Sequence, residues 1–404
     1  MRRWGMRKLL LIPLVLLLVG CPGGEKETVK IGALIPLTGG LASYGEYMQY
    51  AIDVAVEEIN ENGGVLGKEV EVVVKNTETN PDVAGEAAQE LVDEGIRIII
   101  GAAASSSTIE ASEVTIPNEC VLIAPPSTSP DITTLDDNDL VFRTCPSDLF
   151  QGKVMAKYLH DQGKTSIVAL YINNSYGIGL KNVLYQEFAA LGGETLKSVS
   201  YPEEFSILPP ESIDFLPYID TLYARNADVV VLIAYDEGGI AVHKEAEERD
   251  DVIEWFGCDG IMTQGFLDNA GTYAEGIKGT APYHEEDEYY DDFKERYSEK
   301  AGCDPITFIP NTYDAVILAA LAIEHAGTWE DGIAIRDALR EVASGGTAVR
   351  TFADAVEKLQ AGEDIDYNGI SGTLDFDENG DVEAPYEIWE VQSGEFVHVE
   401  VVTP

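Results

Sequence analysis

The sequence predicts an α/β protein of two doubly wound lobes, each built around a mostly parallel sheet. Short, continuously apolar segments alternate with segments whose apolar residues recur at helical spacing, a pattern typical of parallel strands that helices cover on both faces. The alternation starts a second time near residue 165, and 404 residues are enough for two domains of ordinary size. No close repeat is visible, so the two units are alike in architecture only.

The first unit is predicted from four apolar strands and the helices between them. A proline at position 81 suits the first turn of a helix, because its missing N–H would have no partner there. Strands are predicted at 29–36, 69–76, 96–101 and 121–127, and helices over 48–59, over 81–94 and from about Thr108.

The second unit repeats this order, and the chain then becomes mainly helical. Strands are predicted at 165–172, 194–201, 228–235 and 253–258, with helices over 180–192, 219–225 and 239–248 between them. Further helices are predicted at 289–300, 313–325, 333–342 and 352–359. The end of the chain, 372–402, alternates apolar and polar residues and has turn signals at Asn379-Gly380 and Ser393-Gly394, which predicts antiparallel strands.

The N-terminal segment is typical of an export signal. A basic head of arginines and lysine precedes the apolar run 9–19, which is too short to cross a bilayer as a helix. Residues 1–20 are therefore predicted to be a signal peptide. "LVGC" at 18–21 resembles a bacterial lipoprotein box, which implies cleavage before Cys21, a lipid on its thiol and a tether over 21–28; the alternative is an uncleaved anchor.

The composition excludes several functions. Seventy-two acidic residues against 26 basic ones give a net charge of −46, which repels phosphate backbones and argues against a nucleic-acid partner. The sequence predicts no cofactor and no metal site. "DFDENGD" at 375–381 begins like a calcium loop, but position twelve is Tyr386 where a glutamate is required, so a hairpin turn at Asn379-Gly380 is predicted instead.

The cysteines leave the redox state open. Apart from Cys21, the chain has Cys120, Cys145, Cys258 and Cys303, whose three possible pairings the sequence does not distinguish from free thiols.

A cluster of hydroxyl groups follows the strand at 96–101. Ser105, Ser106, Ser107 and Thr108 stand directly before the predicted helix, where serine and threonine commonly cap the first turn. The same position suits anion binding, because ligands of open α/β sheets sit beyond the carboxyl ends of strands and free N–H groups of a helix attract negative charge.

Five segments, taken in order, resemble one family. "IGALIPLTGGLASYGEYMQYAIDVAVEEINENGGVLGKEVEVVV", "APPSTSPDIT", "VFRTCPSDLFQG", "NNSYGIGL" and "LDFDENGD" resemble the type I solute-binding proteins of the leucine/isoleucine/valine-binding family, which serve ABC importers. This resemblance implies two lobes with a ligand cleft between them, hinged at three crossings. Lobe 1 is expected at 29–147 plus 283–372, and lobe 2 at 148–282 plus 373–404.

The resemblance also implies a ligand site. It assigns Ser105 and Thr128 to the ligand's α-carboxylate, the backbone carbonyl of Pro126 to its ammonium group, and Asp259 to that ammonium from the other lobe, while Ser127 belongs to the same strand end. The alternatives are a helix cap for Ser105 and a turn aspartate for Asp259. Aromatic residues expected to wall the cleft are Tyr44, Tyr176, Tyr235 and Phe308.

These inferences predict a lipid-anchored, monomeric, non-enzymatic receptor on the outer side of the membrane. It is expected to close over an amino acid, branched-chain or a similar small zwitterion, and to present it to the permease subunits of an ABC importer, with Cys21 as its membrane attachment. A sensory receptor for an amino acid, amide or small aromatic acid is the alternative, and an amide hydrolase is a remote one. Asp148 and Gln151, at the first crossing, are expected either to act in the hinge or to lie beside the site.

Overall fold

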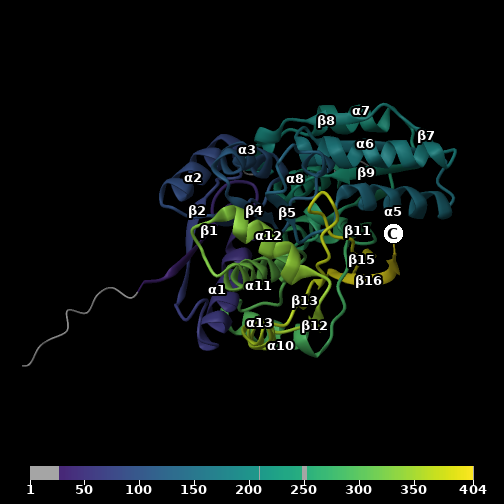
Figure 1. Ribbon diagram of the computed structural model, residues 1–404. Helices are drawn as coiled ribbons and strands as arrows, with labels where there is room; N and C mark the ends of the chain where they lie inside the picture. The colour runs from purple at the N-terminus through teal and green to yellow at the C-terminus, as the bar shows by residue number, and fades with distance from the viewer. Residues whose placement is uncertain (1–26, 209, 248–252, 404) are drawn as a thin grey trace, which may run out of the picture.

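The computed structural model describes residues 27–208, 210–247 and 253–403. The predicted signal peptide, Cys21 and all but the last residues of the tether lie outside the described residues. The fold is α/β with two large sheets, as the strand and helix periodicities predicted, and it also has a small third sheet that was not predicted (Figure 1).

The first large sheet is fully parallel and has strand order β2-β1-β3-β4-β5. Alternate residues of β1 face opposite sides, as the pleat of a strand requires. Ala33 and Ile35 therefore join one apolar cluster, whereas Leu34 joins another with Leu91. The strands are β1 Val29–Ile35, β2 Val70–Asn76, β3 Ile98–Gly101, β4 Val121–Ala124 and β5 Val141–Arg143.

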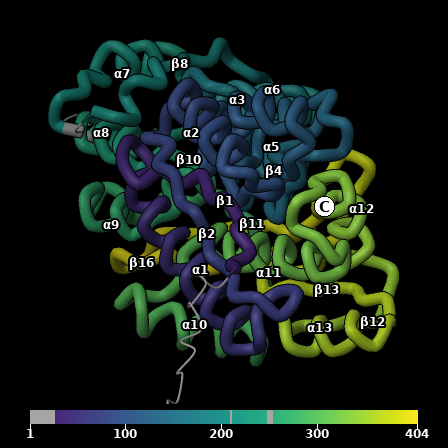
Figure 2. Tube along the Cα trace, turned by 60° about the vertical axis from the view of Figure 1, so that its left-hand side comes forward, coloured from purple at the N-terminus to yellow at the C-terminus, as the bar shows by residue number. Residues whose placement is uncertain are grey.

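Helices cover both faces of this sheet. Those on one face include α11, which is buried along almost its whole length and packs against α1 although nearly 250 residues separate the two helices, as both views of the chain show (Figures 1 and 2). The helices of this lobe are α1 Ala42–Glu61, α2 Pro81–Asp93, α3 Ser105–Thr115, α4 Pro130–Thr133, α10 Glu288–Ala301, α11 Ile309–Ala326, α12 Gly332–Ala343 and α13 Phe352–Ala361.

The second large sheet has strand order β16-β15-β11-β10-β9-β6-β7, with β8 also paired to β6. Strands β6 to β11 run parallel, and β15 and β16 close the edge as an antiparallel pair. The strands are β6 Ser166–Ile172, β7 Glu194–Thr195, β8 Val199–Tyr201, β9 Val229–Ile233, β10 Trp255–Gly257, β11 Lys278–Pro282, β15 Tyr386–Gln392 and β16 Glu395–Val402. The accompanying helices are α5 Asp148–Asp161, α6 Ser175–Ala190, α7 Leu216–Tyr223, α8 Asp236–Glu247 and α9 Gln264–Ala270.

The C-terminal hairpin was predicted correctly at one turn and wrongly at the other. Ser393-Gly394 joins β15 to β16 as expected, but Asn379-Gly380 joins no pair of strands. The Asp377 carboxylate accepts the N–H groups of Asn379 and Asp381, which makes a local turn, and Arg143 draws the Asp381 side chain into the core. The preceding β14 (Gly372–Thr373) instead pairs with β13 (Ile365–Gly369) in a small sheet with β12 (Thr347–Val349).

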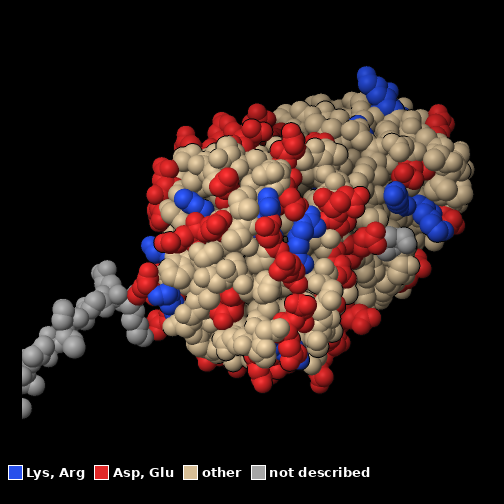
Figure 3. Space-filling view, viewed as in Figure 1, with Lys and Arg blue, Asp and Glu red and all other residues tan. Residues whose placement is uncertain are grey.

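The chain passes between the layers of the two large sheets three times. These passages follow β5, β11 and β14. The residue boundaries of the two expected lobes stay a prediction. Among the described residues, no helix is both long enough and apolar enough to span a membrane. Acidic side chains cover the visible surface far more densely than basic ones (Figure 3).

The four cysteines in the described part of the chain form no disulfide. Cys120, Cys145 and Cys258 are free and buried, and Cys303 is free and exposed. None of the three pairings that the sequence left open is therefore present among these residues.

Candidate ligand-binding site

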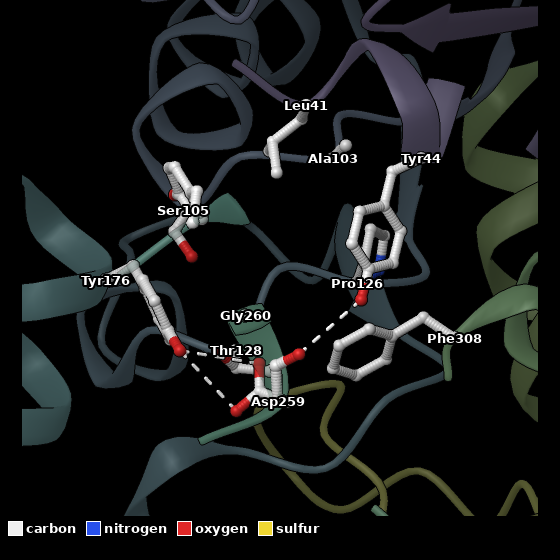
Figure 4. A pocket seen from close by; sticks show the side chains of 11 residues that line it. Leu41, Tyr44, Ala103, Ser105, Pro126, Thr128, Tyr176, Asp259, Gly260 and Phe308 are labelled. Carbon is white, nitrogen blue, oxygen red and sulfur yellow. Dashed lines mark hydrogen bonds between the residues drawn. The ribbon is translucent and has the colours of Figure 1, made fainter. Parts of the chain in front are cut away.

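A cavity with about 380 Å³ of empty space, counting its opening to solvent, lies between the two large sheets. Most of the residues that line it come just after the carboxyl ends of parallel strands, and these strands belong to both sheets. Figure 4 shows the Ser105 hydroxyl pointing into this space above Asp259, with Tyr176 on one side and Tyr44 on the other. The lining residues are Leu41, Tyr44, Ala103, Ser105, Pro126, Thr128, Tyr176, Tyr235, Asp259, Gly260 and Phe308.

Eight of the nine predicted ligand residues line this one cavity. Ser127 is the exception, because its side chain is fully buried behind the wall. Its hydroxyl contacts the Ala102 carbonyl at 2.9 Å and Thr108 Oγ1 at 2.7 Å, which holds the turn after β3 in place. The structure thus gives the Ser127 side chain a supporting position rather than a place in the cavity wall.

The turn between β3 and α3 aims the helix at the cavity. Gly101 has φ of 126°, and a Cβ there would lie 2.3 Å from the Leu34 carbonyl oxygen, so a side chain at this position would clash. Thr108 Oγ1 accepts a hydrogen bond from the Ala102 N–H at 3.1 Å. These contacts place the first turn of α3 at the cavity wall.

Helix capping does not explain Ser105. The residue before α3 is Ala104, and no side chain caps this helix terminus. The Ser105 hydroxyl instead accepts the Ser129 N–H at 3.3 Å and lies on the cavity wall, 3% exposed. The uncapped N–H groups and the dipole of this eleven-residue helix favour a negatively charged group at its N-terminus.

Among the described residues that line the cavity, Asp259 is the only charged one. It follows β10 and is 3% exposed. Gln151 Nε2 donates to its Oδ1 at 2.5 Å, and the Tyr176 hydroxyl lies 3.5 Å from both carboxylate oxygens. Burial raises the pKa of Asp259, and the hydrogen bonds from Gln151 and Tyr176 oppose that shift.

Aromatic side chains form much of the remaining wall. Tyr176 and Tyr235 stack with their ring centres 5.6 Å apart. The Tyr44 hydroxyl, from the lobe of the first sheet, lies 3.5 Å from the backbone oxygen of Asp259 in the other lobe. Burial, and after it the nearby acidic groups, raises the pKa of Tyr44 and of Tyr176 well above the usual value, so both hydroxyls keep their protons.

Phe308 reaches the cavity from a different direction, directly before α11. Its backbone is left-handed, with φ of 70°, and this conformation costs a residue with a side chain about 1 kcal/mol. Strain of this kind persists where the surrounding structure determines it, often at ligand sites. Here it accompanies an aromatic ring that is placed on the cavity wall.

Leu41, Ala103 and Gly260 also line the cavity and were not predicted. Each lies within three positions of a predicted residue, in the loop that follows a strand. That place beyond the carboxyl end of a strand was the available signal. Their side chains have no distinctive chemistry, so residue type alone does not single them out.

Comparisons with known proteins identify the family and the fold. The family model described as periplasmic binding protein matches residues 28–395. The chain belongs to the periplasmic binding protein family. The resemblance to type I leucine/isoleucine/valine-binding proteins is confirmed, and so is the fold class.

Two relatives of this periplasmic binding protein, and a third protein that shares its fold, have names that state a ligand or an output. A chemotactic signal transduction system substrate-binding protein, BasB, of Halobacterium salinarum is 29% identical over 86% of this chain and 83% of its own length. The leucine binding protein LivK of Thermotoga maritima is 27% identical, with a TM-score of 0.80 over 93% of this chain and 99% of the other. An ABC transporter solute binding protein of R. palustris, in complex with benzoate, is 18% identical, with a TM-score of 0.78 over 94% and 97%.

Proposed function

We propose that this chain is a non-enzymatic receptor that binds a small zwitterionic amino acid between its lobes and delivers it to an ABC importer. One observation supports this most directly. The cavity combines neutral hydroxyls and a helix N-terminus near Ser105 with a single buried carboxylate, Asp259, and no lysine or arginine lines it. An α-carboxylate suits the first group and an ammonium the second.

The same charge pattern argues against two other ligands or activities. A benzoate-like anion has no ammonium group to offset Asp259, so its carboxylate would enter a cavity that already holds a negative charge. Hydrolysis of an amide by Ser105 needs a base in contact with its hydroxyl, and no histidine or lysine lines the cavity. We therefore favour amino acids as ligands and binding without catalysis.

Calorimetric titration tests the assignment with leucine, isoleucine, valine, alanine and benzoate. We expect an aliphatic amino acid to bind with a free energy of about −8 kcal/mol, a micromolar Kd, and benzoate not to bind. Asp259→Ala and Ser105→Ala should each weaken binding by about tenfold or more, because hydrogen bonds to charged groups contribute about 1.5–3 kcal/mol. Unchanged binding in both variants would defeat the site assignment.

Export, the lipid on Cys21, the lobe boundaries and closure about a hinge belong to the same proposal. Closure follows if one ligand contacts Ser105 and Thr128 from one lobe and Asp259 from the other, since only such differential contact shifts an open state to a closed one.

Sensing is the second candidate output, because the relative BasB is a chemotactic protein. Uptake of labelled amino acid by vesicles that contain an ABC permease for amino acids separates the two. Transport that depends on this chain supports import, and binding without transport supports sensing.

A further inference from the structure

Asp148 is a buried carboxyl group whose two oxygens lack a hydrogen-bond partner within normal hydrogen-bond distance. It is the first residue of α5 and is fully buried directly behind the cavity. Neither of its carboxyl oxygens has a hydrogen-bond partner, and the Oε1 atom of neighbouring Gln151 also lacks one. An ionised carboxylate in such surroundings is strongly unfavourable, whereas the neutral acid is tolerated.

Asp259 lies close enough to Asp148 for their charges to interact, but its surroundings differ. Gln151 Nε2 and the Tyr176 hydroxyl both point at the Asp259 carboxylate. Two adjacent buried carboxyls do not both ionise readily, and the one with donors keeps its charge more easily. The donors therefore select Asp259 as the charged member of the pair.

The cation nearest Asp148 is already engaged. The Arg143 guanidinium pairs with Asp381, with Nη2 2.5 Å from Oδ1, and its Nη1 donates to the Ser129 carbonyl at 2.9 Å. The N-terminus of α5 favours a negative charge, but Ser147 accepts the first free N–H there. The other titratable groups that interact with Asp148 are Asp259, Cys145, Tyr176, Tyr235 and Tyr386, none of which is cationic.

The Asp148 N–H donates to the Thr128 carbonyl at 2.8 Å, which makes Thr128 of the cavity wall a direct neighbour of Asp148. Burial, and after it the Asp259 charge, raises the pKa of Asp148 well above its usual range, and the Thr128 hydroxyl opposes that shift. A hydroxyl has a single proton to donate. If Asp148 were ionised, it would accept a hydrogen bond from the Thr128 hydroxyl. Only the lone pairs of Thr128 Oγ1 would then face the carboxylate of a ligand. A protonated Asp148 can donate to Thr128 Oγ1 instead, which frees the Thr128 proton for the ligand.

We infer that Asp148 is the neutral, protonated member of a buried carboxyl pair and a positioning residue that orients the Thr128 hydroxyl, while Asp259 alone carries the charge that receives an ammonium group. The statement about the ligand rests on the proposed function. The statement about protonation concerns the unliganded protein and is independent of it.

The first test measures unfolding of the ligand-free protein and of Asp148→Asn across pH 4 to 7. A carboxyl whose pKa is raised by folding binds more protons in the folded state, so wild-type stability falls as pH rises above the unfolded pKa of about 3.9. Asparagine does not titrate, so the Asp148→Asn protein lacks this loss. Its free energy of unfolding should therefore rise relative to that of the wild type as the pH rises. A difference that does not change with pH would overturn the inference.

The second test measures leucine binding at pH 7. We expect Asp148→Asn, which keeps a neutral donor, to bind within about threefold of wild type, and Asp259→Asn to bind about tenfold more weakly or worse. Equal losses in the two variants would show that Asp148 carries charge and would overturn the inference. If wild type binds no amino acid, the proposed function fails, and the unfolding test still decides the protonation state.

A third measurement covers the case in which Asp148→Asn does not fold. Carbon NMR of wild-type protein labelled at its aspartate carboxyls should show one carboxyl that stays protonated at pH 7. A spectrum in which every aspartate is ionised at that pH would contradict the inference.

Discussion

Glu203 joins the two lobes across the mouth of the site. Its Oε1 accepts hydrogen bonds from Ser106 Oγ at 3.1 Å and from Asn174 Nδ2 at 3.0 Å. Ser106 lies in the first turn of α3, and Asn174 caps α6 in the other lobe. One carboxylate thus connects the helix beside Ser105 to the lobe that holds Asp259.

Ser106→Ala should weaken ligand binding by about threefold to tenfold, because a partly exposed hydrogen bond to a carboxylate is lost only from the closed state. The loss should appear mainly as faster ligand release in stopped-flow measurements. Ser107→Ala is the matched control, since the buried Ser107 hydroxyl has no hydrogen-bond partner. Equal effects of the two variants would contradict a role for the Glu203 contact.

Gly40→Ala should oppose closure. A Cβ at Gly40 would lie 2.0 Å from the Ser206 carbonyl oxygen in the other lobe, which is far inside van der Waals contact. We expect affinity to fall by about tenfold or more and the ligand-induced decrease in radius of gyration, measured by X-ray scattering, to shrink. Gly85→Ala is the control, because its nearest neighbour is the flexible Glu110 side chain. If the Gly40→Ala protein closed normally, the close approach of Gly40 to Ser206 would not be needed for closure.

Asp236 should make stability depend on pH. Burial raises its pKa to about 6, against hydrogen bonds from Thr263 and Ser43. The folded state therefore binds more protons than the unfolded state between about pH 4 and 6, so stability is lost as pH rises through this window, by up to about 3 kcal/mol. Asp236→Asn should flatten the pH dependence of urea unfolding there.

Asp228 provides the control of opposite sign. Hydrogen bonds from the Thr165 hydroxyl and from the Thr165 and Ser166 N–H groups lower its pKa. Its stabilising contribution is present above the unfolded pKa and is lost as pH falls. Asp228→Asn should therefore destabilise the protein more at pH 7 than at pH 3, and matching trends in the two variants would refute both assignments.

The cysteines should respond to reagents as four separate free thiols. A reductant should leave the thermal unfolding midpoint unchanged, because the described residues contain no disulfide. In a thiol-labelling time course read by peptide mapping, Cys303 should react in the native protein, and Cys120, whose pKa burial raises to about 12, should react only on unfolding. Early labelling of Cys120 would contradict its burial.

Most long elements were predictable because their signals are local. Continuous apolar runs such as 229–233 mark strands buried on both faces, and the cavity residues Ser105 and Asp259 stand directly after such strands. Short elements were missed, including the three-residue β5 and β12 and the two-residue β14, because two or three residues show no period. The five-residue strands β11 and β13 and the fourteen-residue helix α5 were also not predicted. The break of 194–201 into β7 and β8 was missed for the same reason.

The ends of the strands, and the hydroxyl and carboxyl groups that follow them, could be read from the chain because both depend on neighbouring residues. Three features required the folded structure: Gln151 donates to Asp259, the Asp148 carboxyl oxygens are buried without a hydrogen-bond partner, and Ser106 donates to Glu203. The two hydrogen bonds join residues about 100 positions apart. The first two features arise from the packing of α5 against the second sheet, and the third arises from the packing of one lobe on the other. Contacts between such distant residues cannot be predicted from a local sequence pattern.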